Sequence, residues 1–202
     1  MNLEMWGVHP LEHFGGIIHD EQERRKWQNP EDILAEIGLR PGMTFMDIGC
    51  GQGFFTIPAA RIVGDSGKIY ASDISQTNIN KLREKVISAG LTNVIMETVK
   101  AEELKLSEIY ADIIFFGIVL HDFENPRKVL ANAHSMLKPA GRLANLDWKN
   151  EPMDLGPPSH IRFSEEKAKH LIESSGFKVQ LIKESGLYHY IIIAELRESK
   201  IN

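Results

Sequence analysis

A short apolar run followed by three alternating glycines constrains the fold of this chain more than any other feature. The segment Phe45–Phe55 begins like a buried strand and carries an acid, Asp47, near the end of that strand. Glycines follow at Gly49, Gly51 and Gly53. A chain that turns sharply from a strand into a helix, with its backbone against a ligand, needs residues without a Cβ at the turn. The segment therefore predicts a strand, a ligand-binding loop and a helix in succession.

The residues around the glycines indicate which ligand the loop holds. A dinucleotide loop has the pattern G-x-G-x-x-G, but Phe54 occupies the position of its third glycine. Asp47 would also bring a negative charge close to a pyrophosphate, whereas a cationic amine suits this acid. The pattern D-x-G-x-G-x-G resembles motif I of the class I S-adenosylmethionine-dependent methyltransferases. The resemblance implies that the Asp47–Gly53 loop, Cys50 included, holds the methionine part of S-adenosyl-L-methionine.

The next predicted strand ends in a second acid. Lys68–Ile74 is a β-prone run that ends in Asp73 and Ile74. These residues follow the glycines by about 20 positions, where doubly wound folds place a carboxylate for ribose hydroxyls. We interpret Asp73 as the ribose ligand, with Ile74 beside it in the cofactor site. The alternative is that Asp73 caps a helix beginning near Ser75, because Asp and Ser are both good N-caps.

A third segment is similar to another motif of the same superfamily. Lys100–Leu104 resembles the G-D-A-x-x-L segment that flanks the adenine, which implies cofactor contacts from Ala101 and Glu102. Lys100 stands where the family usually has an acid, and Glu102 is interpreted as its substitute. The alternative is that Glu102 and Glu103 are first-turn acids favoured by a helix dipole.

A fourth segment narrows the resemblance to one group. Asp112–Phe123 resembles the fourth-strand segment of the type 11, or ubiquinone and menaquinone-biosynthesis, methyltransferases, and Leu137–Leu143 resembles their L-K-P-G-G-x-L turn. The resemblance implies that Gly117 borders the cofactor and that His121 borders the acceptor pocket. We interpret His121 as a substrate contact or general base, with a packed, hydrogen-bonded histidine as the alternative.

Strand-like and helical patterns alternate along the chain, which predicts a parallel sheet in an α/β fold. Helices are expected at 30–37, 54–63, 75–89, 125–137 and 164–175, a strand at 142–148, and a hairpin at 178–182 and 188–196. The resemblance implies a Rossmann-like, doubly wound seven-stranded sheet, mostly parallel with an antiparallel C-terminal strand.

Length and composition predict a single domain. The chain has 202 residues and 43% hydrophobic content, enough for one well-buried domain and too little for two ordinary ones. We divide residues 1–202 into an N-terminal lid or arm (1–29), a cofactor-binding core (30–148), and a substrate-side loop followed by a C-terminal helix and hairpin (149–202).

Charge and targeting signals favour a small-molecule substrate in the cytoplasm. The net charge is -5, and the densest basic cluster, Arg24–Lys26, directly follows acidic residues, which disfavours a nucleic-acid partner. No stretch is long enough for a membrane helix, and the first residues lack a signal-peptide pattern. The single cysteine, Cys50, excludes internal disulfides and cysteine metal clusters and is interpreted as structural. The sequence carries no signal for an oligomeric state.

The N-terminal segment 1–29 is rich in aromatic residues and histidines. We interpret it as a lid over the methyl donor, with a packing arm as the alternative. Three histidines and an acid in this segment have the residue types of metal ligands: His9, His13, His19 and Asp20. Pro10 breaks the helical spacing of the first two histidines, and we expect no metal.

These patterns together predict an S-adenosylmethionine-dependent methyltransferase that transfers a methyl group to a small-molecule acceptor by in-line displacement. One alternative is a non-catalytic S-adenosylmethionine-binding protein, which would keep the donor site and lose the acceptor pocket. The other is an NAD-dependent oxidoreductase, which Asp47 and the missing third glycine disfavour.

Overall fold

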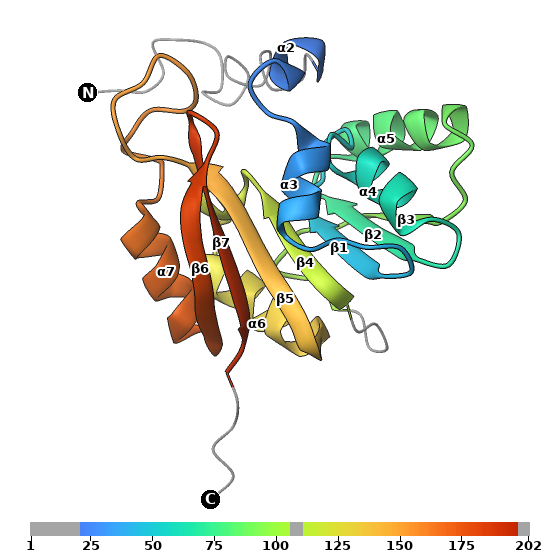
Figure 1. The fold of residues 1–202 in the computed structure, drawn as a ribbon. Coiled ribbons are helices and arrows are strands. Elements are labelled where there is room, and N and C mark those ends of the chain that lie inside the picture. Colours follow the sequence, from blue (N-terminus) through green and yellow to red (C-terminus); the bar gives the residue numbers. More distant parts are fainter. Residues whose placement is uncertain (1–20, 106–110, 198–202) are drawn as a thin grey trace, which may run out of the picture.

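The computed structural model describes residues 21–105 and 111–197, which form an α/β fold around one seven-stranded sheet (Figure 1). The strand order is β3-β2-β1-β4-β5-β7-β6. Strands β1 to β5 pair in parallel, whereas β7 lies antiparallel to both β5 and β6. The order reverses between β1 and β4, which creates a topological switch point. This mostly parallel, Rossmann-like sheet confirms the predicted fold class.

The elements follow one another along the chain as the alternating patterns predict. The strands are β1 (Thr44–Ile48), β2 (Lys68–Asp73), β3 (Val94–Thr98), β4 (Ala111–Gly117), β5 (Leu137–Trp148), β6 (Phe177–Ser185) and β7 (His189–Leu196). The helices are α2 (Glu21–Arg25), α3 (Pro30–Glu36), α4 (Thr56–Val63), α5 (Gln76–Ser88), α6 (Pro126–Met136) and α7 (Glu165–Ser174), with a 3₁₀ turn, η2 (Leu120–Asp122).

Side-chain caps explain where the long helices begin. Asn29, Ser75, Asn125 and Ser164 each accept a hydrogen bond from a backbone N–H two or three residues further on, as N-caps do. Proline is the first residue of α3 and of α6, where its missing N–H costs nothing. Helix α4 begins at Thr56 and not at position 54, because the turn after the glycines takes in two further residues.

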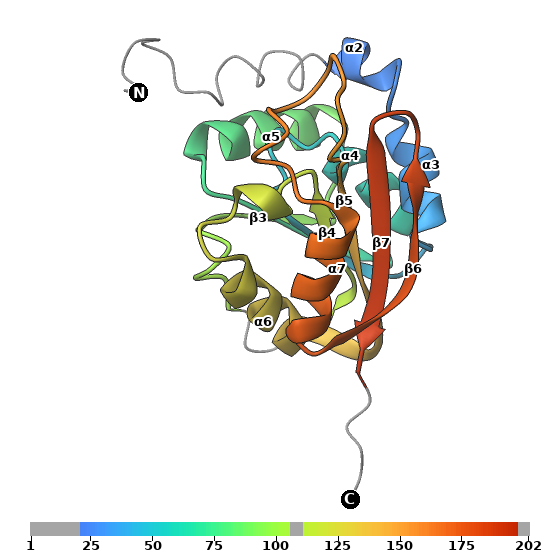
Figure 2. The same ribbon diagram turned by 90° about the vertical axis from the view of Figure 1, so that its left-hand side faces the viewer.

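Helices cover both faces of the sheet (Figures 1 and 2). Helices α3, α4 and α5 pack on one face over a cluster that includes Leu34, Ala59 and Phe115. Helices α6 and α7 pack on the other face over a cluster that includes Leu130 and Phe116. Neighbouring residues of β4 thus face opposite clusters, as expected for a central strand that is buried on both sides.

Strands β5 and β6 are longer than the sequence patterns indicated, whereas β7 begins one residue later than expected. β5 begins at Leu137 and not at Arg142, and the pairing of β4 with β5 shifts register between Ala111 and Ile113. The turn expected within Leu137–Leu143 is therefore an irregular part of a strand. Proline and glycine favour turns in sequence patterns, but a bulge in the register accommodates them at the start of this strand.

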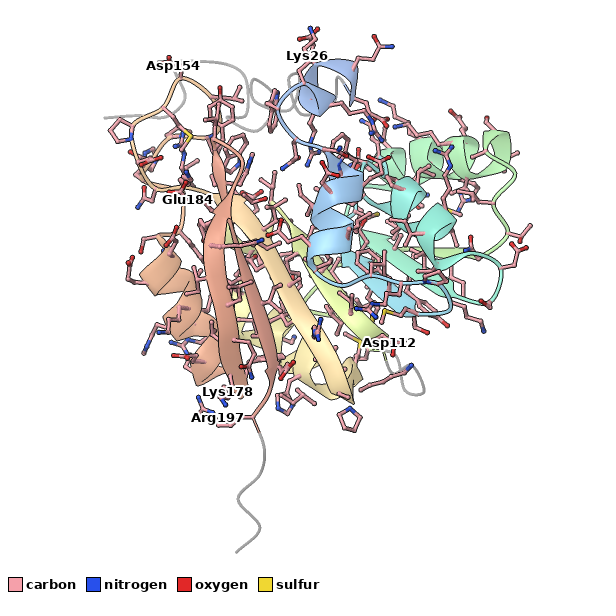
Figure 3. All side chains as sticks on the ribbon, viewed as in Figure 1. Lys26, Asp112, Asp154, Lys178, Glu184 and Arg197 are labelled. Carbon is pink, nitrogen blue, oxygen red and sulfur yellow. The ribbon has the colours of Figure 1, made fainter. Side chains whose placement is uncertain are left out.

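The carboxyl ends of the parallel strands gather at the end of the molecule where α2 and the segment after β5 lie (Figure 1). Lys26 and Asp154 mark this end in Figure 3, and Asp112, at the amino end of β4, lies at the opposite end. Asp112 Oδ2 accepts the backbone N–H of Thr44 and the Lys138 Nζ, each at 2.8 Å. These bonds fix the amino ends of three neighbouring strands and leave the carboxyl ends for ligand binding.

The histidines and the acid weighed as metal ligands, His9, His13, His19 and Asp20, lie outside the described residues. Within residues 21–105 and 111–197, no cluster of side chains has the composition of a metal site. The helices in these ranges are also too short or too polar to cross a membrane.

Candidate active site

A cavity of about 170 Å³ lies at the carboxyl ends of β1 and β2, beside the switch point of the sheet. Open α/β sheets bind ligands at this place. Five of the predicted cofactor residues line it: Gly49, Asp73, Ile74, Ala101 and Glu102. The other predicted residues lie outside its lining: Asp47, Cys50, Gly51, Gly53, Gly117 and His121. The structure thus brings the predicted ribose and adenine residues together around one space.

Backbone geometry explains the glycines of the loop. Gly49, Gly51 and Gly53 have φ angles of 78°, 54° and 89°, a region that residues with a Cβ disfavour. A Cβ on Gly49 would lie 2.7 Å from Val119 Cγ2, and one on Gly53 would overlap Leu82. The glycines therefore give the loop its shape and allow neighbouring side chains to pack directly on its backbone.

The Asp73 carboxylate braces the same loop. Its Oδ2 accepts the N–H of Gly51 at 2.8 Å, and its Oδ1 accepts the N–H of Ser75 at 2.8 Å and the Asn78 Nδ2 at 3.2 Å. Ser75, and not Asp73, is the N-cap of α5, which corrects the alternative given for Asp73. A carboxylate offers about four acceptor positions, so ribose binding would share this carboxylate with the loop.

The predicted adenine segment is held in place by α6. Asn132 Nδ2 donates to the carbonyl oxygens of Ala101 at 3.2 Å and Glu102 at 2.9 Å. The Glu102 carboxylate accepts the N–H of Asn125 at 3.0 Å, which links the segment to the start of α6. Ile74, across the cavity, lines its wall while remaining 65% exposed. The cavity thus has a fixed wall and an apolar edge open to solvent.

The turn after β4 contributes cavity residues that the sequence analysis missed, notably Val119 and Phe123. Ile118 introduces this turn with a φ of 65°, and its N–H donates to the Leu146 carbonyl at 2.8 Å. A branched side chain at such an angle costs about 1 to 3 kcal/mol and persists only where the surroundings enforce it. The strained turn directs Val119 onto Gly49. The one signal in the sequence for these cavity residues was that the turn follows a strand at the switch point.

Asp47 lies beneath the loop, outside the lining of the cavity. It is 2% exposed, and its Oδ2 accepts the Thr56 hydroxyl at 2.6 Å. Burial raises the pKa of Asp47 to about 7, against the lowering effect of the Thr56 hydrogen bond. The charge of Asp73 raises this pKa further, and that of Arg24 lowers it. Asp47 thus joins β1 to α4 and carries a carboxyl group that titrates near neutrality.

Cys50 and Gly117 support the loop from the side of the core. The Cys50 side chain is 7% exposed, and burial raises the pKa of its thiol, which stays protonated. This environment is that of a structural cysteine. A Cβ on Gly117 would lie 2.7 Å from the Phe115 ring and 3.0 Å from the Phe55 ring. The missing side chain of Gly117 therefore gives space to aromatic residues under the loop.

His121, in η2, forms a buried pair with Asp147 of β5. Nδ1 lies 2.6 Å from Asp147 Oδ1, and the two side chains are 3% and 0% exposed. Nε2 lies 3.4 Å from Asp122 Oδ1. Burial lowers the pKa of His121, but the carboxylates of Asp147 and Asp122 outweigh it, so the net pKa is raised. His121 is therefore packed and hydrogen-bonded, as in the alternative considered from the sequence. The sequence patterns did not indicate its partner, Asp147.

The irregular segment after β5, predicted as the substrate-side loop, is organised by Arg162. The guanidinium donates to four backbone carbonyls, those of Lys149, Glu151, Leu155 and Pro157, at 2.5 to 3.2 Å. An irregular segment has no strand partner for its carbonyls, and the planar fork of an arginine can satisfy several at once. The segment does not line the cavity, and its role as an acceptor wall remains a prediction.

The described end of the N-terminal segment packs on the carboxyl end of the sheet. The Trp27 ring stacks on His189, with 5.6 Å between ring centroids, and lies 5.9 Å from the Trp148 ring. Burial lowers the pKa of His189 to about 3, so this ring is neutral. Glu21 of α2 pairs with Lys85 of α5 at 2.9 Å. Helix α2 is thus tied to the core near the loop, and the rest of the predicted lid or arm lies outside the described residues.

Comparison with known proteins identifies the family. The strand order and the cavity at the switch point define a Rossmann-like methyltransferase fold. The methyltransferase domain family matches residues 39–192, more than half of the chain. The chain therefore belongs to the class I S-adenosylmethionine-dependent methyltransferase family.

Curated relatives that the chain matches include methyltransferases named for quinone biosynthesis. The ubiquinone/menaquinone biosynthesis C-methyltransferase UbiE of Vibrio campbellii is 35% identical over 118 residues, which covers 58% of this chain and 46% of the relative. The UbiE of Klebsiella pneumoniae is 28% identical over 156 residues, which covers 75% of this chain and 62% of the relative. The chain spans about half the length of the first of these relatives.

Solved structures share the fold over most of the chain. A SAM-dependent methyltransferase from Aquifex aeolicus has a TM-score of 0.85 and 32% identity, covering 94% of this chain and 99% of that chain. A putative type 11 methyltransferase from Sulfolobus solfataricus has a TM-score of 0.73 and 25% identity, covering 87% of this chain and 96% of that chain.

The residues around the cavity fit S-adenosylmethionine, the cofactor of this family. Gly49 exposes its backbone to the cavity without a side chain, and the Asp73 carboxylate can accept hydrogen bonds from the ribose hydroxyls of the cofactor. The apolar side chains of Ile74, Val119 and Phe123 offer surfaces for a flat aromatic base.

Proposed function

We propose that this protein transfers a methyl group from S-adenosylmethionine to a small-molecule acceptor by in-line displacement. The observation that carries the proposal is the cavity in which the Gly49 backbone, the Asp73 carboxylate and the Ala101 segment meet. The net charge of -5 supports a small molecule over a nucleic acid. The names of the relatives support an acceptor that is methylated on carbon.

The proposed donor contacts follow from the sides of the cavity. We assign the ribose hydroxyls to Asp73 and the adenine to the walls formed by Ile74, Ala101 and Glu102. The methionine part lies along the Asp47–Gly53 loop, beside Gly117. This assignment places the donor across the switch point of the sheet, with its methyl group toward the turn after β4.

Positioning is the main contribution of the chain to the proposed reaction. Bound S-adenosylmethionine supplies a methyl group on a sulfonium. Side chains that hold an acceptor about 3 Å away, in line and without water, contribute roughly 7 to 11 kcal/mol to lowering the barrier. The rigid loop and the strained turn at Ile118 supply fixed walls for this purpose.

We propose the His121–Asp147 pair as the proton acceptor, since a carbon or hydroxyl acceptor must lose a proton on methylation. Asp147 accepts from Nδ1, which leaves Nε2 to take the proton. The raised pKa of His121 predicts that base catalysis strengthens as pH rises through that pKa, because only the neutral ring accepts a proton.

Replacing Asp147 by Asn is expected to lower the pKa of His121 by about one to three pH units, because the imidazolium loses its nearest negative charge. The amide keeps an oxygen for the Trp148 N–H, which Asp147 accepts at 2.9 Å. The measurement is an NMR titration of the His121 ring. Asp122→Asn is the matched control and should lower the pKa less, since Asp122 is farther from the ring and 38% exposed. An unchanged His121 pKa in Asp147→Asn would contradict the pairing.

Calorimetric titration of the protein with S-adenosylmethionine, S-adenosylhomocysteine and NAD tests the donor site. We expect micromolar dissociation constants for the first two and no binding of NAD. Binding of NAD alone would overturn the proposal in favour of an oxidoreductase. A screen of small-molecule acceptors with radiolabelled methyl donor then separates an enzyme from a protein that binds the donor without transfer.

A further inference from the structure

Asp122 lies between the cavity and the buried His121–Asp147 pair. Asp122 lines the cavity and its side chain is 38% exposed, whereas the side chains of His121 and Asp147 are 3% and 0% exposed. Asp122 Oδ1 lies 3.4 Å from His121 Nε2, and His121 Nδ1 lies 2.6 Å from Asp147 Oδ1. His121 itself does not line the cavity. The three side chains thus form a row that begins at the cavity and ends in the core.

The cavity end of this row has two groups that hold a proton more tightly than usual. Burial raises the pKa of Asp122, although the charge of His121 opposes this effect, and Asp147 adds to it. Burial and the charge of Arg162 lower the pKa of His121, but Asp147 and Asp122 outweigh them and raise it. Two proton acceptors therefore adjoin at the cavity, and the Asp147 carboxylate compensates the positive charge that a protonated ring carries.

The charges around the cavity indicate which acceptor such a base serves. Among the described residues, the lining carries four carboxylates, those of Asp73, Glu102, Asp122 and Glu124. Lys100 is the one cation of this lining, and it lies 3.4 Å from Glu124. An excess of negative charge attracts a sulfonium and repels an anion. An acceptor that arrives uncharged, with its proton still on a hydroxyl or an acidic carbon, therefore suits this cavity and needs a base.

We propose that Asp122 is the catalytic base for an uncharged acceptor and passes the acceptor's proton to Nε2 of His121. This assignment rests on the proposed function. The O–H or C–H bond of the acceptor breaks, and its electron pair forms the bond to the methyl carbon. The pair of the methyl–sulfur bond returns to sulfur. The row gains one positive charge as the donor loses one, so the net charge of the site is unchanged.

The separation of Asp122 from Nε2 agrees with a site that awaits its ligands. A distance of 3.4 Å is long for proton transfer, but catalytic hydrogen bonds commonly shorten when substrates bind. The N–H of Asp122 donates to the Val119 carbonyl at 3.0 Å, and Val119 also lines the cavity. The backbone of the turn thus fixes where the Asp122 side chain begins.

The test compares two ligands by NMR, because S-adenosylmethionine carries a sulfonium that S-adenosylhomocysteine lacks. His121→Asn leaves Asp122 to titrate without the ring, and the new amide nitrogen takes the place of Nδ1 as donor to Asp147. Asp122→Asn leaves His121 to titrate without Asp122. Replacing S-adenosylhomocysteine by S-adenosylmethionine should lower the pKa of Asp122 in the first variant by about one pH unit. It should lower that of His121 in the second variant by less than half as much, because the Coulomb interaction weakens with distance.

The order of these two shifts decides the assignment. A larger shift for His121 than for Asp122 would mean that the ring faces the methyl group directly, and no shift in either variant would place the row away from the methyl group. Both results overturn the role of Asp122. If a variant fails to fold, the wild type gives the same order from the Asp122 carboxyl and His121 ring resonances. Glu124→Gln is the matched control on the same turn, since Glu124 is 79% exposed and pairs with Lys100. Its His121 titration should match that of the wild type in both complexes.

Kinetics with an acceptor from the radiolabel screen give a second readout. Asp122→Asn should lower kcat about a hundredfold or more, as expected for the loss of a general base. Its dissociation constant for S-adenosylhomocysteine should stay within twofold of the wild type, and Asp122→Glu, which keeps a carboxylate, should recover part of kcat. An unchanged kcat with weakened S-adenosylhomocysteine binding would assign Asp122 to the donor and overturn its role as base. Calorimetry with the wild type tests the donor site separately, because a protein that does not bind S-adenosylhomocysteine contradicts the proposed function itself.

Discussion

Replacing Asp73 by Ala is expected to weaken the binding of S-adenosylmethionine and S-adenosylhomocysteine about tenfold or more. The carboxylate lines the cavity, and hydrogen bonds from ribose hydroxyls to a charged group contribute about 1.5 to 3 kcal/mol. A loss of about 1.4 kcal/mol already corresponds to a tenfold change in the dissociation constant. Calorimetric titration of the wild type and the variant measures this difference directly, and an unchanged dissociation constant would count against the ribose assignment.

Asp73 also holds the loop, so the experiment needs controls that separate the two roles. Asp73 accepts the N–H groups of Gly51 and Ser75, each at 2.8 Å. Asp73→Asn keeps one oxygen and the shape of the side chain, and should lose less affinity than Asp73→Ala. Asn78→Ala removes the 3.2 Å contact to Asp73 without touching the cavity lining, and should bind the donor like the wild type. Equal losses in all three variants would indicate a loop effect.

The glycine loop and Asp73 were predictable because their signals are local. A positive φ at Gly49 and at Gly53 requires glycine, and the fold places an acid at the end of the second strand. Such requirements appear within a few residues of the sequence. The alternation of strands and helices likewise predicted the parallel sheet, and the resemblance to the methyltransferase family implied its antiparallel end, which β7 forms.

The partners of the functional side chains were not predictable, because they come from distant elements. His121 lies 26 positions from Asp147 in the sequence, and parallel pairing of β4 with β5 brings them within 2.6 Å. Arg162 binds backbone carbonyls of an irregular segment, and backbone acceptors leave no trace in residue types. Pattern analysis identifies which side chains a site contains more readily than which atoms they contact.

Arg24 shows how a local pattern misleads when tertiary contacts override it. Three consecutive basic residues, Arg24–Lys26, are typical of a solvated surface. Tertiary packing instead places Arg24 over the Phe54 ring, while the side chains of Arg25 and Lys26 stay 37% and 67% exposed. The apolar stem and planar head of arginine can pack on an aromatic ring, although burial of Arg24 lowers the pKa of its guanidinium to about 9.

The buried Asp47 is expected to make the donor-free protein lose stability as pH rises through neutrality. Its pKa is about 7 in the folded chain, against an ordinary value of 3.8. The folded state therefore binds more protons than the unfolded state between about pH 4 and pH 7, and linkage then lowers the free energy of unfolding as pH increases. At 1.36 kcal/mol per pH unit, this group alone accounts for about 2 to 3 kcal/mol between pH 5 and pH 8.

Asp47→Asn removes this titration while leaving an oxygen for the Thr56 hydroxyl, which donates to Asp47 at 2.6 Å. Urea unfolding of both proteins at pH 5 and pH 8 gives four free energies. We expect the free energy of unfolding of the variant, relative to that of the wild type, to rise by about 2 to 3 kcal/mol from pH 5 to pH 8. The reason is that all other titrating groups are common to both proteins. Asp47→Asn also removes a negative charge close to Arg24, which could destabilise the variant by an amount that does not depend on pH. That amount cancels when the change between pH 5 and pH 8 is compared. A difference between the two proteins that is independent of pH would mean that Asp47 is ionised throughout, as it would be if Arg24 fully compensated its charge.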